Sequence, residues 1–275
     1  MRKQFPQTTA RSLISPRGFI AATVAFVLLV VFCIAFVDRP VATWVHENVG
    51  GERFGWFAIN YAGVPLKFGP FALMATPAEA LWPLAPFIAM VMAIAALVGR
   101  PPKGYGPIPV AICFSVLAAI PINGYLKFAF GRTWPESWIG RNPSWIDDGV
   151  YGFFPFHQGE GWRAFPSGHT MAITAFASVL YVALPKLRLA CVALVALVVL
   201  GLIGGNYHFV SDTIAGLYFG AGIGLGTAAL MLSPTAGTGA DQVYRSSECQ
   251  DIRPAQRAST LEGVRTYGSF LGEPS

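Results

Sequence analysis

Charged residues are scarce in this sequence. Lys, Arg, Asp and Glu make up 12% of the 275 residues, against 54% hydrophobic residues, and the mean hydropathy is +0.52. A soluble domain carries about 25% charged residues, and one soluble core cannot bury so much apolar surface. The apolar residues also occur in long uninterrupted runs. The composition therefore excludes an ordinary soluble protein and predicts a polytopic membrane protein.

Cysteine is also rare, with four residues and no Cys-x-x-Cys pair. Cys33, Cys113 and Cys191 fall in predicted membrane spans, and Cys249 falls in the C-terminal region. This distribution argues against a disulfide framework and against a cysteine-based metal cluster. We expect the protein to use neither a metal nor another cofactor.

Runs without Lys, Arg, Asp or Glu predict where the chain crosses the membrane. About 20 apolar residues are needed to cross a hydrocarbon layer of about 30 Å. The predicted fold class is therefore all-α, a membrane bundle of six transmembrane helices at residues 18–37, 80–99, 108–126, 169–185, 189–207 and 213–232. Residues 54–74 are apolar too, but proline, glycine and Lys67 interrupt them. We predict an interfacial or re-entrant piece there.

The six spans define one membrane domain, residues 18–232, which follows a cytoplasmic segment of residues 1–17. Residues 233–275 are rich in Gly, Ser, Thr, Pro and Arg without apolar periodicity, which predicts a disordered cytoplasmic tail. A cleaved signal peptide is the competing interpretation of residues 1–37. Because no small-x-small cleavage site follows the apolar run before Asp38, we expect a retained helix.

Basic residues indicate the orientation of the bundle. With the N-terminus inside, most of the 19 Lys and Arg residues lie on the cytoplasmic side. This bias predicts a cell (inner) membrane protein with both termini in the cytoplasm. Anionic lipid headgroups then explain the net charge of +5 better than nucleic acid does. No obligate protein partner is evident.

This threading brings the unusual polar residues to one face of the membrane. Lys127 follows the third predicted span, His169 begins the fourth, His208 follows the fifth and Asp212 precedes the sixth. All four then face the exterior, or periplasm. Ionisable groups at the mouths of apolar helices are costly and usually mark function, so we expect a shared site there.

The residue types in this site predict phosphoryl chemistry. Ser167-Gly168-His169 lies at a helix start, where unpaired backbone N–H groups and the positive end of the dipole attract a phosphate. His208 and Asp212 are four residues apart, so the carboxylate can hold one ring nitrogen while the other faces a substrate. We therefore predict that His208 is a nucleophile and that His169 protonates the departing oxygen.

Three motifs resemble the signature of the type 2 phosphatidic acid phosphatase (PAP2) family, which shares its fold with vanadium haloperoxidases. They are Lys127, the run Pro166-Ser167-Gly168-His169 and His208-x3-Asp212, in that order. The resemblance covers roughly residues 80–230. It implies a helical bundle with a PAP2/haloperoxidase-like core and metal-independent hydrolysis of a phosphomonoester or diphosphate on a lipid. The implied roles are nucleophile for His208, orienting partner for Asp212, acid for His169 and phosphate ligand for Lys127, Ser167 and Gly168.

The sequence departs from the family pattern at two arginines. Trp134 stands where the first motif has arginine, and Gly201-Leu202 stand where the third motif has Ser-Arg. A hydrogen bond to a charged group contributes about 1.5–3 kcal/mol, so losing two would cost roughly 10² to 10⁴ in rate. We predict that Arg132 substitutes for a lost arginine as a phosphate ligand, and failing that Arg163. Arg141 lies in the same loop.

Other interpretations stay open at this point. Lys127 can simply extend to the interface, and Asp212 can cap the sixth span. The aromatic residues of the loop 132–165 fit a belt at the membrane surface or, alternatively, a lid on the lipid headgroup. His46 and His157 belong to no motif, and we interpret them as loop or interface residues.

Two classes of function remain. The first is a membrane lipid phosphatase acting on a lipid such as phosphatidic acid or a polyprenyl diphosphate through a phospho-histidine, with a lipid phosphotransferase as a close variant. The second is a non-catalytic membrane protein that binds or transports phosphorylated lipid, which the two missing arginines keep open. The His-x3-Asp spacing favours the enzyme, because a binding site does not need it.

Overall fold

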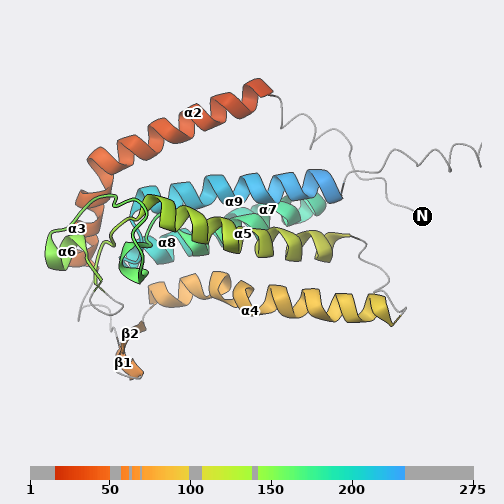
Figure 1. The fold of residues 1–275 in the computed structure, drawn as a ribbon, viewed down its shortest axis with the longest axis horizontal. Helices are drawn as coiled ribbons and strands as arrows, with labels where there is room; N and C mark the ends of the chain where they lie inside the picture. Colours follow the sequence, from red (N-terminus) through yellow and green to blue (C-terminus); the bar gives the residue numbers. More distant parts are fainter. Residues whose placement is uncertain are drawn as a thin grey trace, which may run out of the picture. The chain divides into compact units, whose positions relative to one another are not determined.

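The computed structural model describes residues 16–49, 57–61, 64–68, 70–98, 107–137 and 142–232. The predicted disordered tail and nearly all of the predicted N-terminal segment lie outside these ranges. Apolar helices dominate the described part of the chain (Figure 1), so the predicted helical membrane fold is confirmed.

The helices follow the predicted apolar runs. They are α2 (Pro16–Phe32), continued by the π-helical turn η1 (Cys33–Val37) and by α3 (Asp38–Asn48), then α4 (Pro70–Leu97), α5 (Ile108–Phe130), α7 (Gly168–Ala183), α8 (Arg188–Gly204) and α9 (Val210–Met231). Short elements are α6 (Trp145–Asp148) and the 3₁₀ turns η3 (Glu160–Trp162) and η4 (Pro185–Leu187). Within the described residues, five helical stretches are long and apolar enough to cross a membrane. The sixth, α7, has 16 residues and is mostly buried among the others.

The second crossing begins ten residues earlier than predicted. α4 starts at Pro70, because proline fits the first helical position, where its missing N–H is not needed. The predicted start at residue 80 was wrong. It was set by Glu79, the charged residue that precedes the uncharged run, but α4 includes this residue. Part of the segment predicted as interfacial or re-entrant pairs instead as an antiparallel hairpin of β1 (Phe57–Tyr61) and β2 (Val64–Phe68). This hairpin is the departure from an all-α fold in the described residues.

A stripe of glycines holds α9 against α7. At Gly216, Gly220 and Gly224 an added Cβ would lie 2.5–2.7 Å from a carbonyl oxygen of α7 or of Ser167, the residue that caps it. Small residues spaced four apart let two helix backbones approach closely. The beginnings of both helices are consequently joined, and the backbone N–H of Ser167 donates to the carbonyl of Asp212 at 3.0 Å.

The opposite side of α7 packs against α4 and α8. Its buried cluster consists of Ala75, Ala78, Ile173, Val198 and Leu202. Leu202 occupies the position of the arginine in the family's third motif, and only 2% of it is exposed. This position therefore belongs to the hydrophobic core of the bundle.

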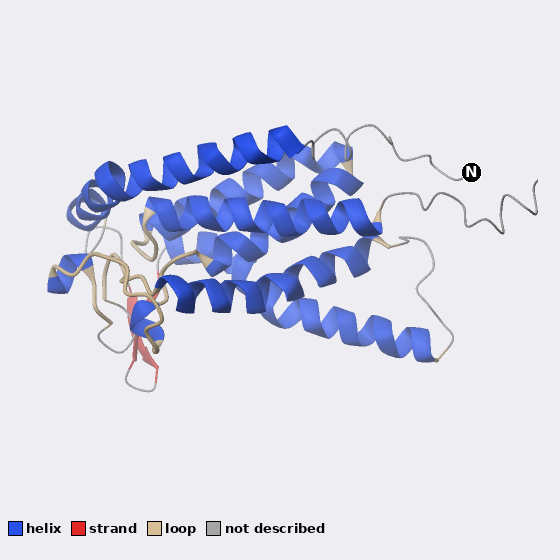
Figure 2. Cartoon of the chain, turned by 45° about the horizontal axis from the view of Figure 1, so that its top comes forward, coloured by secondary structure: helices blue, strands red, loops and turns tan. Residues whose placement is uncertain are grey.

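The N-terminal helix lies along α9 (Figure 1). The Thr23 hydroxyl and the Tyr218 hydroxyl are 2.7 Å apart, and the Phe26 and Tyr218 rings stack at 4.0 Å. The π-helical turn η1 then changes the phase of the helix, and Asp38, the next residue, is buried. Figure 2 shows that α3, α6 and most loop segments gather at the same end of the bundle.

Candidate active site

The predicted site residues lie at this loop-covered end. Lys127 belongs to the last turn of α5, His169 to the first turn of α7 and Asp212 to the first turn of α9, while His208 lies between α8 and α9. Backbone hydrogen bonds join the loops that carry them, including Ala164 N–H to the Arg132 carbonyl at 3.1 Å. Helix ends far apart in the sequence are thus held in one place.

His208 and Asp212 form the expected pair. The Nδ1 atom of His208 lies 3.4 Å from Oδ2 of Asp212, and both side chains are buried. The same Oδ2 accepts the backbone N–H of Phe209 at 3.0 Å. Phe209 is the N-cap of α9, so Asp212 is not the cap residue but reaches back to it from the third helical position. The carboxylate of Asp212 therefore both stabilises the start of α9 and orients the imidazole of His208.

Burial lowers the pKa of His208, and the hydrogen bond that its ring donates to Asp212, together with the negative charge of Asp212, opposes that effect only in part. The ring is therefore neutral at pH 7, as a nitrogen nucleophile must be. The charge of Lys127 acts in the same direction as burial.

His169 stands beside an acidic residue that sequence reasoning missed. Its Nε2 atom lies 3.8 Å from Oε1 of Glu79 on α4, so a protonated His169 has a carboxylate partner. About 30% of the His169 side chain is exposed, and it is close enough to His208 and Lys127 for electrostatic interaction with both. The sequence feature that could have identified Glu79 as a site residue is its position as a single carboxylate within an apolar helix.

The ring of Trp134 lies near both Lys127 and His208. The centre of the Trp134 ring lies 5.5 Å from Nζ of Lys127 and 5.2 Å from the centre of the His208 ring. Its Nε1–H donates to the carbonyl of Glu160 at 2.9 Å, and 5% of the residue is exposed. Lys127 thus lies over an aromatic face, where its charge is favourably placed.

Arg163 is the arginine beside Lys127. Its Nη1 donates to Oε1 of Glu160 at 3.0 Å, and 39% of its side chain is exposed. Its charge and that of Glu160 both act on Lys127. The guanidinium of Arg163 is therefore partly accessible, in contrast to that of Arg132. Arg141 lies outside the described residues.

Arg132 has a different environment. Its Nη1 donates to Ser211 Oγ and, at 2.8 Å, to Asp212 Oδ1, while Nη2 donates to Asp38 Oδ2 at 2.6 Å and to the Tyr151 hydroxyl at 2.9 Å. Burial lowers the pKa of Arg132, but the two carboxylates outweigh it and raise the pKa, so the guanidinium stays charged.

The side chain of Arg132 is entirely buried, and the rings of Phe153 and Phe209 lie 4.8 and 4.6 Å from its Cζ. All four N–H groups on its η nitrogens are used within the protein. This placement, behind Asp212 rather than beside Lys127, disagrees with the predicted phosphate-binding role. Sequence reasoning missed Asp38 and Tyr151, its partners, because contacts so distant along the chain leave no local pattern.

Ser167 and Gly168 begin α7 as predicted. The Ser167 hydroxyl oxygen caps the helix by accepting the N–H of Thr170 at 3.4 Å and its hydroxyl at 3.1 Å. A Cβ at Gly168 would lie 2.9 Å from Oδ1 of Asn123, whose Nδ2 donates to the carbonyl of Pro166 at 3.1 Å. Asn123, another residue that was missed, thus supports the turn that carries the predicted phosphate ligands.

Comparison with known proteins gives two related sequences. The chain is 32% identical over 115 residues to a lipid A 1-phosphatase of Rhizobium johnstonii, covering 42% of this chain and 44% of the relative. It is 33% identical over 103 residues to a lipid A 1-phosphatase of Rhizobium etli, covering 38% and 41%. The chain spans less than half the length of these curated relatives.

One solved structure and one family model also match. The structure is that of a transmembrane PAP2-type phosphatidylglycerolphosphate phosphatase from Bacillus subtilis, with a TM-score of 0.48, 15% identity and coverage of 78% of this chain and 98% of that one. The model of the PAP2 superfamily matches residues 108–234, which include Lys127, His169, His208 and Asp212. This segment of the chain, a little under half of its length, is therefore similar to the PAP2 superfamily.

Proposed function

We propose that this protein is an integral-membrane lipid phosphatase that removes phosphate from a phosphomonoester or diphosphate of a lipid. The observation that carries the proposal is the buried pair of His208 and Asp212, with the Nδ1-to-Oδ2 distance of 3.4 Å. A carboxylate on Nδ1 leaves Nε2 as the nucleophilic nitrogen of a neutral imidazole. His169, at the adjacent helix start, supplies the second ionisable ring.

The reaction proceeds in two steps. In the first, Nε2 of His208 attacks the phosphorus, a P–N bond forms, the P–O bond to the lipid breaks, and protonated His169 gives its proton to the leaving oxygen. In the second, neutral His169 takes a proton from water, which attacks the phospho-histidine and releases inorganic phosphate. Glu79, whose Oε1 lies 3.8 Å from Nε2 of His169, is the carboxylate that can pair with this ring when it is protonated.

The phosphate is bound by groups at the same end of the bundle. Lys127 supplies a positive charge, and Arg163 takes the role first predicted for Arg132, because its guanidinium is partly exposed beside Lys127. The Ser167 hydroxyl accepts two hydrogen bonds from Thr170 and so retains its own O–H for a phosphate oxygen. The first turn of α7 contributes backbone N–H groups.

Phosphate release by the purified protein in detergent tests the proposal. Lipid A is the first substrate to try, since both related sequences are lipid A 1-phosphatases, followed by phosphatidic acid and undecaprenyl diphosphate. The described residues contain no group of three His, Cys, Asp or Glu side chains that could hold a metal ion. The resemblance to the PAP2 family implies a metal-independent reaction, so we expect activity in the presence of EDTA and inhibition by vanadate.

A histidine variant provides the matched control. His208→Gln should abolish release and the acid-labile phosphoryl-enzyme, whereas His157→Gln, which changes an exposed histidine of the loop, should retain both. Transfer of label to a second lipid instead of water would identify a phosphotransferase. Binding of these lipids without any release would favour the non-catalytic alternative, which the apolar Trp134 and Leu202 at the two arginine positions support.

We further propose that the site faces the exterior, as the distribution of Lys and Arg predicts. Intact spheroplasts should then hydrolyse a membrane-impermeant phosphate ester at the rate of lysed ones. Activity that appears only after lysis would place the site on the cytoplasmic side.

A further inference from the structure

Asp38 is the buried carboxylate that the proposed reaction does not use. It follows the π-helical turn η1, and 1% of it is exposed. Its Oδ1 accepts the backbone N–H of Ser211 at 2.9 Å, and its Oδ2 accepts the Ser211 hydroxyl and Nη2 of Arg132. Asp38 lies outside residues 108–234, the segment shared with the PAP2 superfamily. An isolated carboxylate so deeply buried would be very costly, so its partners explain its presence.

These contacts form a continuous chain that ends at the nucleophile. Asp38 holds Nη2 of Arg132, Nη1 of Arg132 holds Oδ1 of Asp212 at 2.8 Å, and Oδ2 of Asp212 faces Nδ1 of His208 at 3.4 Å. Asp38, Arg132 and Asp212 all have side chains that are 0% exposed. Because each of these side chains is buried and hydrogen-bonded to the next, we expect a displacement of Asp38 to alter the position of Asp212.

The chain carries two negative charges and one positive charge. Arg132 therefore does not fully neutralise Asp212, because it also neutralises Asp38. The remaining negative charge lies on the Nδ1 side of His208, where it stabilises a positive ring. Charged or titratable groups that act on His208 from the packed elements are Asp212 on α9, Lys127 on α5 and His169 on α7.

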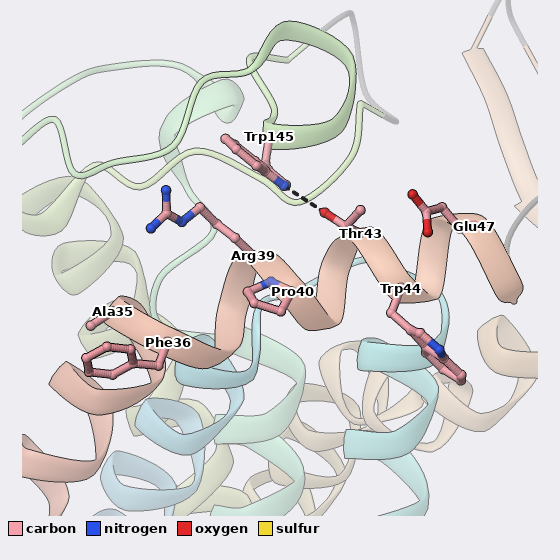
Figure 3. Close-up of a pocket in the computed structure, with 8 residues that line it drawn as sticks. All are labelled: Ala35, Phe36, Arg39, Pro40, Thr43, Trp44, Glu47 and Trp145. Atoms are coloured by element: carbon pink, nitrogen blue, oxygen red, sulfur yellow. Dashed lines mark hydrogen bonds between the residues drawn. The ribbon is translucent and has the colours of Figure 1, made fainter.

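α3 is fixed in place independently of Asp38. Figure 3 shows the outward face of this helix, where Nε1–H of Trp145 on α6 donates to Oγ1 of Thr43 at 3.1 Å. Glu47 lies on the same face and is exposed. Substitutions on α3 can therefore alter the buried charge while the helix stays docked.

We propose that Asp38 is a positioning residue of the active site, which fixes the Asp212 carboxylate through Arg132 and Ser211 and thereby sets the orientation and charge of His208. The N-terminal helix is then part of the catalytic apparatus and not only a membrane anchor. This inference rests on the proposed function for its catalytic consequence, but the coupling of Asp38 to His208 can be measured without turnover.

The test compares Asp38→Asn with Glu47→Gln, two acid-to-amide changes on the same helix. Asp38→Asn should lower kcat by at least about tenfold, since small displacements of a reacting group have effects of this size or larger. KM should change by less than about threefold, because the variant leaves Lys127 and Arg163 in place. Glu47→Gln should match the wild type in both constants.

The pH titration of His208 distinguishes a positioning role of Asp38 from a purely structural one, because a purely structural role would leave the titration unchanged. Histidine-selective NMR in detergent, assigned with His208→Gln, should show that the ring in Asp38→Asn titrates about half a pH unit or more lower, because Arg132 then neutralises the charge of Asp212 more completely. An unchanged titration, or a kcat that falls only with the folded fraction, overturns the proposal. If the wild type releases no phosphate, the proposed function fails while the titration still decides the role of Asp38.

A second variant serves if Asp38→Asn does not fold. Asp38→Glu keeps the charge but moves the carboxylate by one methylene group. It should leave the His208 titration near that of the wild type while lowering kcat. Wild-type kcat in this variant would overturn the positioning role.

Discussion

Replacing Arg132 with alanine should destabilise the protein strongly. The substitution removes four hydrogen bonds and leaves the carboxylates of Asp38 and Asp212 buried without a cation. Breaking a buried ion pair by removing one partner costs about 3–5 kcal/mol. At about 2–4 °C for each kcal/mol in a chain of this size, the midpoint of thermal unfolding should fall by roughly 6–20 °C.

Arg163→Ala is the comparison that separates stability from phosphate binding. The side chain of Arg163 is 39% exposed and pairs with Glu160, which is 65% exposed, and such pairs contribute at most about 1 kcal/mol. The unfolding midpoint should therefore change by less than about 4 °C. If Arg163 binds the phosphate, KM should rise by about tenfold or more, the equivalent of one hydrogen bond to a charged group.

Thermal unfolding in detergent and steady-state phosphate release measure both effects. Equal midpoints for Arg132→Ala and the wild type would refute the reasoning, since they would mean that the two carboxylates do not depend on this guanidinium. A large loss of stability in Arg163→Ala together with an unchanged KM would show that the two roles are reversed.

Three further predictions concern Trp134, the glycine stripe and His208. Trp134→Arg should raise kcat/KM for lipid phosphates by about tenfold, because a guanidinium near Lys127 and His208 would add a charged hydrogen bond, and a decrease would mean that the ring itself is needed. Gly220→Ala should destabilise the protein by about 1–3 kcal/mol, because the added Cβ would clash with α7. Gly222→Ala is the control, since nothing lies within 4 Å of its added Cβ. Equal unfolding midpoints for the two variants would contradict the close packing of α9 on α7. Because burial lowers the pKa of His208 from 6.5, the midpoint of the acidic limb in the pH profile of kcat/KM should lie below pH 6.5. The folded state then binds fewer protons than the unfolded state, so stability should decrease as pH falls through 6.5, and pH-dependent unfolding checks the sign.

The helices could be predicted because apolar length is a local property. Residues 108–126 and 189–207 were predicted close to the limits of α5 and α8. Glu79 misled the prediction of α4, since a carboxylate near the active site was taken as the end of a span. The stripe formed by Gly216, Gly220 and Gly224 was present in the sequence, but only the structure shows that its partner is the backbone of α7.

The site was predictable where spacing in the sequence carries the geometry. His208 and Asp212 are four residues apart across the start of α9, and Ser167 lies at the start of α7, so their contacts follow from local structure. Arg132 was different. Its position near Trp134 suggested a phosphate ligand, but its partner Asp38 is 94 residues away, and no local pattern reveals such a contact.

The same buried network links folding to chemistry in this bundle. A guanidinium and two carboxylates are tolerated in the interior because each finds partners there, and the partners come from α3, the loop after α5 and the first turn of α9. None of these segments can move away without leaving a buried charge unpaired, which would cost several kcal/mol. The orientation of Asp212 is therefore as stable as the fold itself, and His208 is aligned before any substrate binds. Apolar residues of similar volume often replace a buried ion pair without loss of stability, so we infer that this cluster is retained because it orients Asp212 and His208.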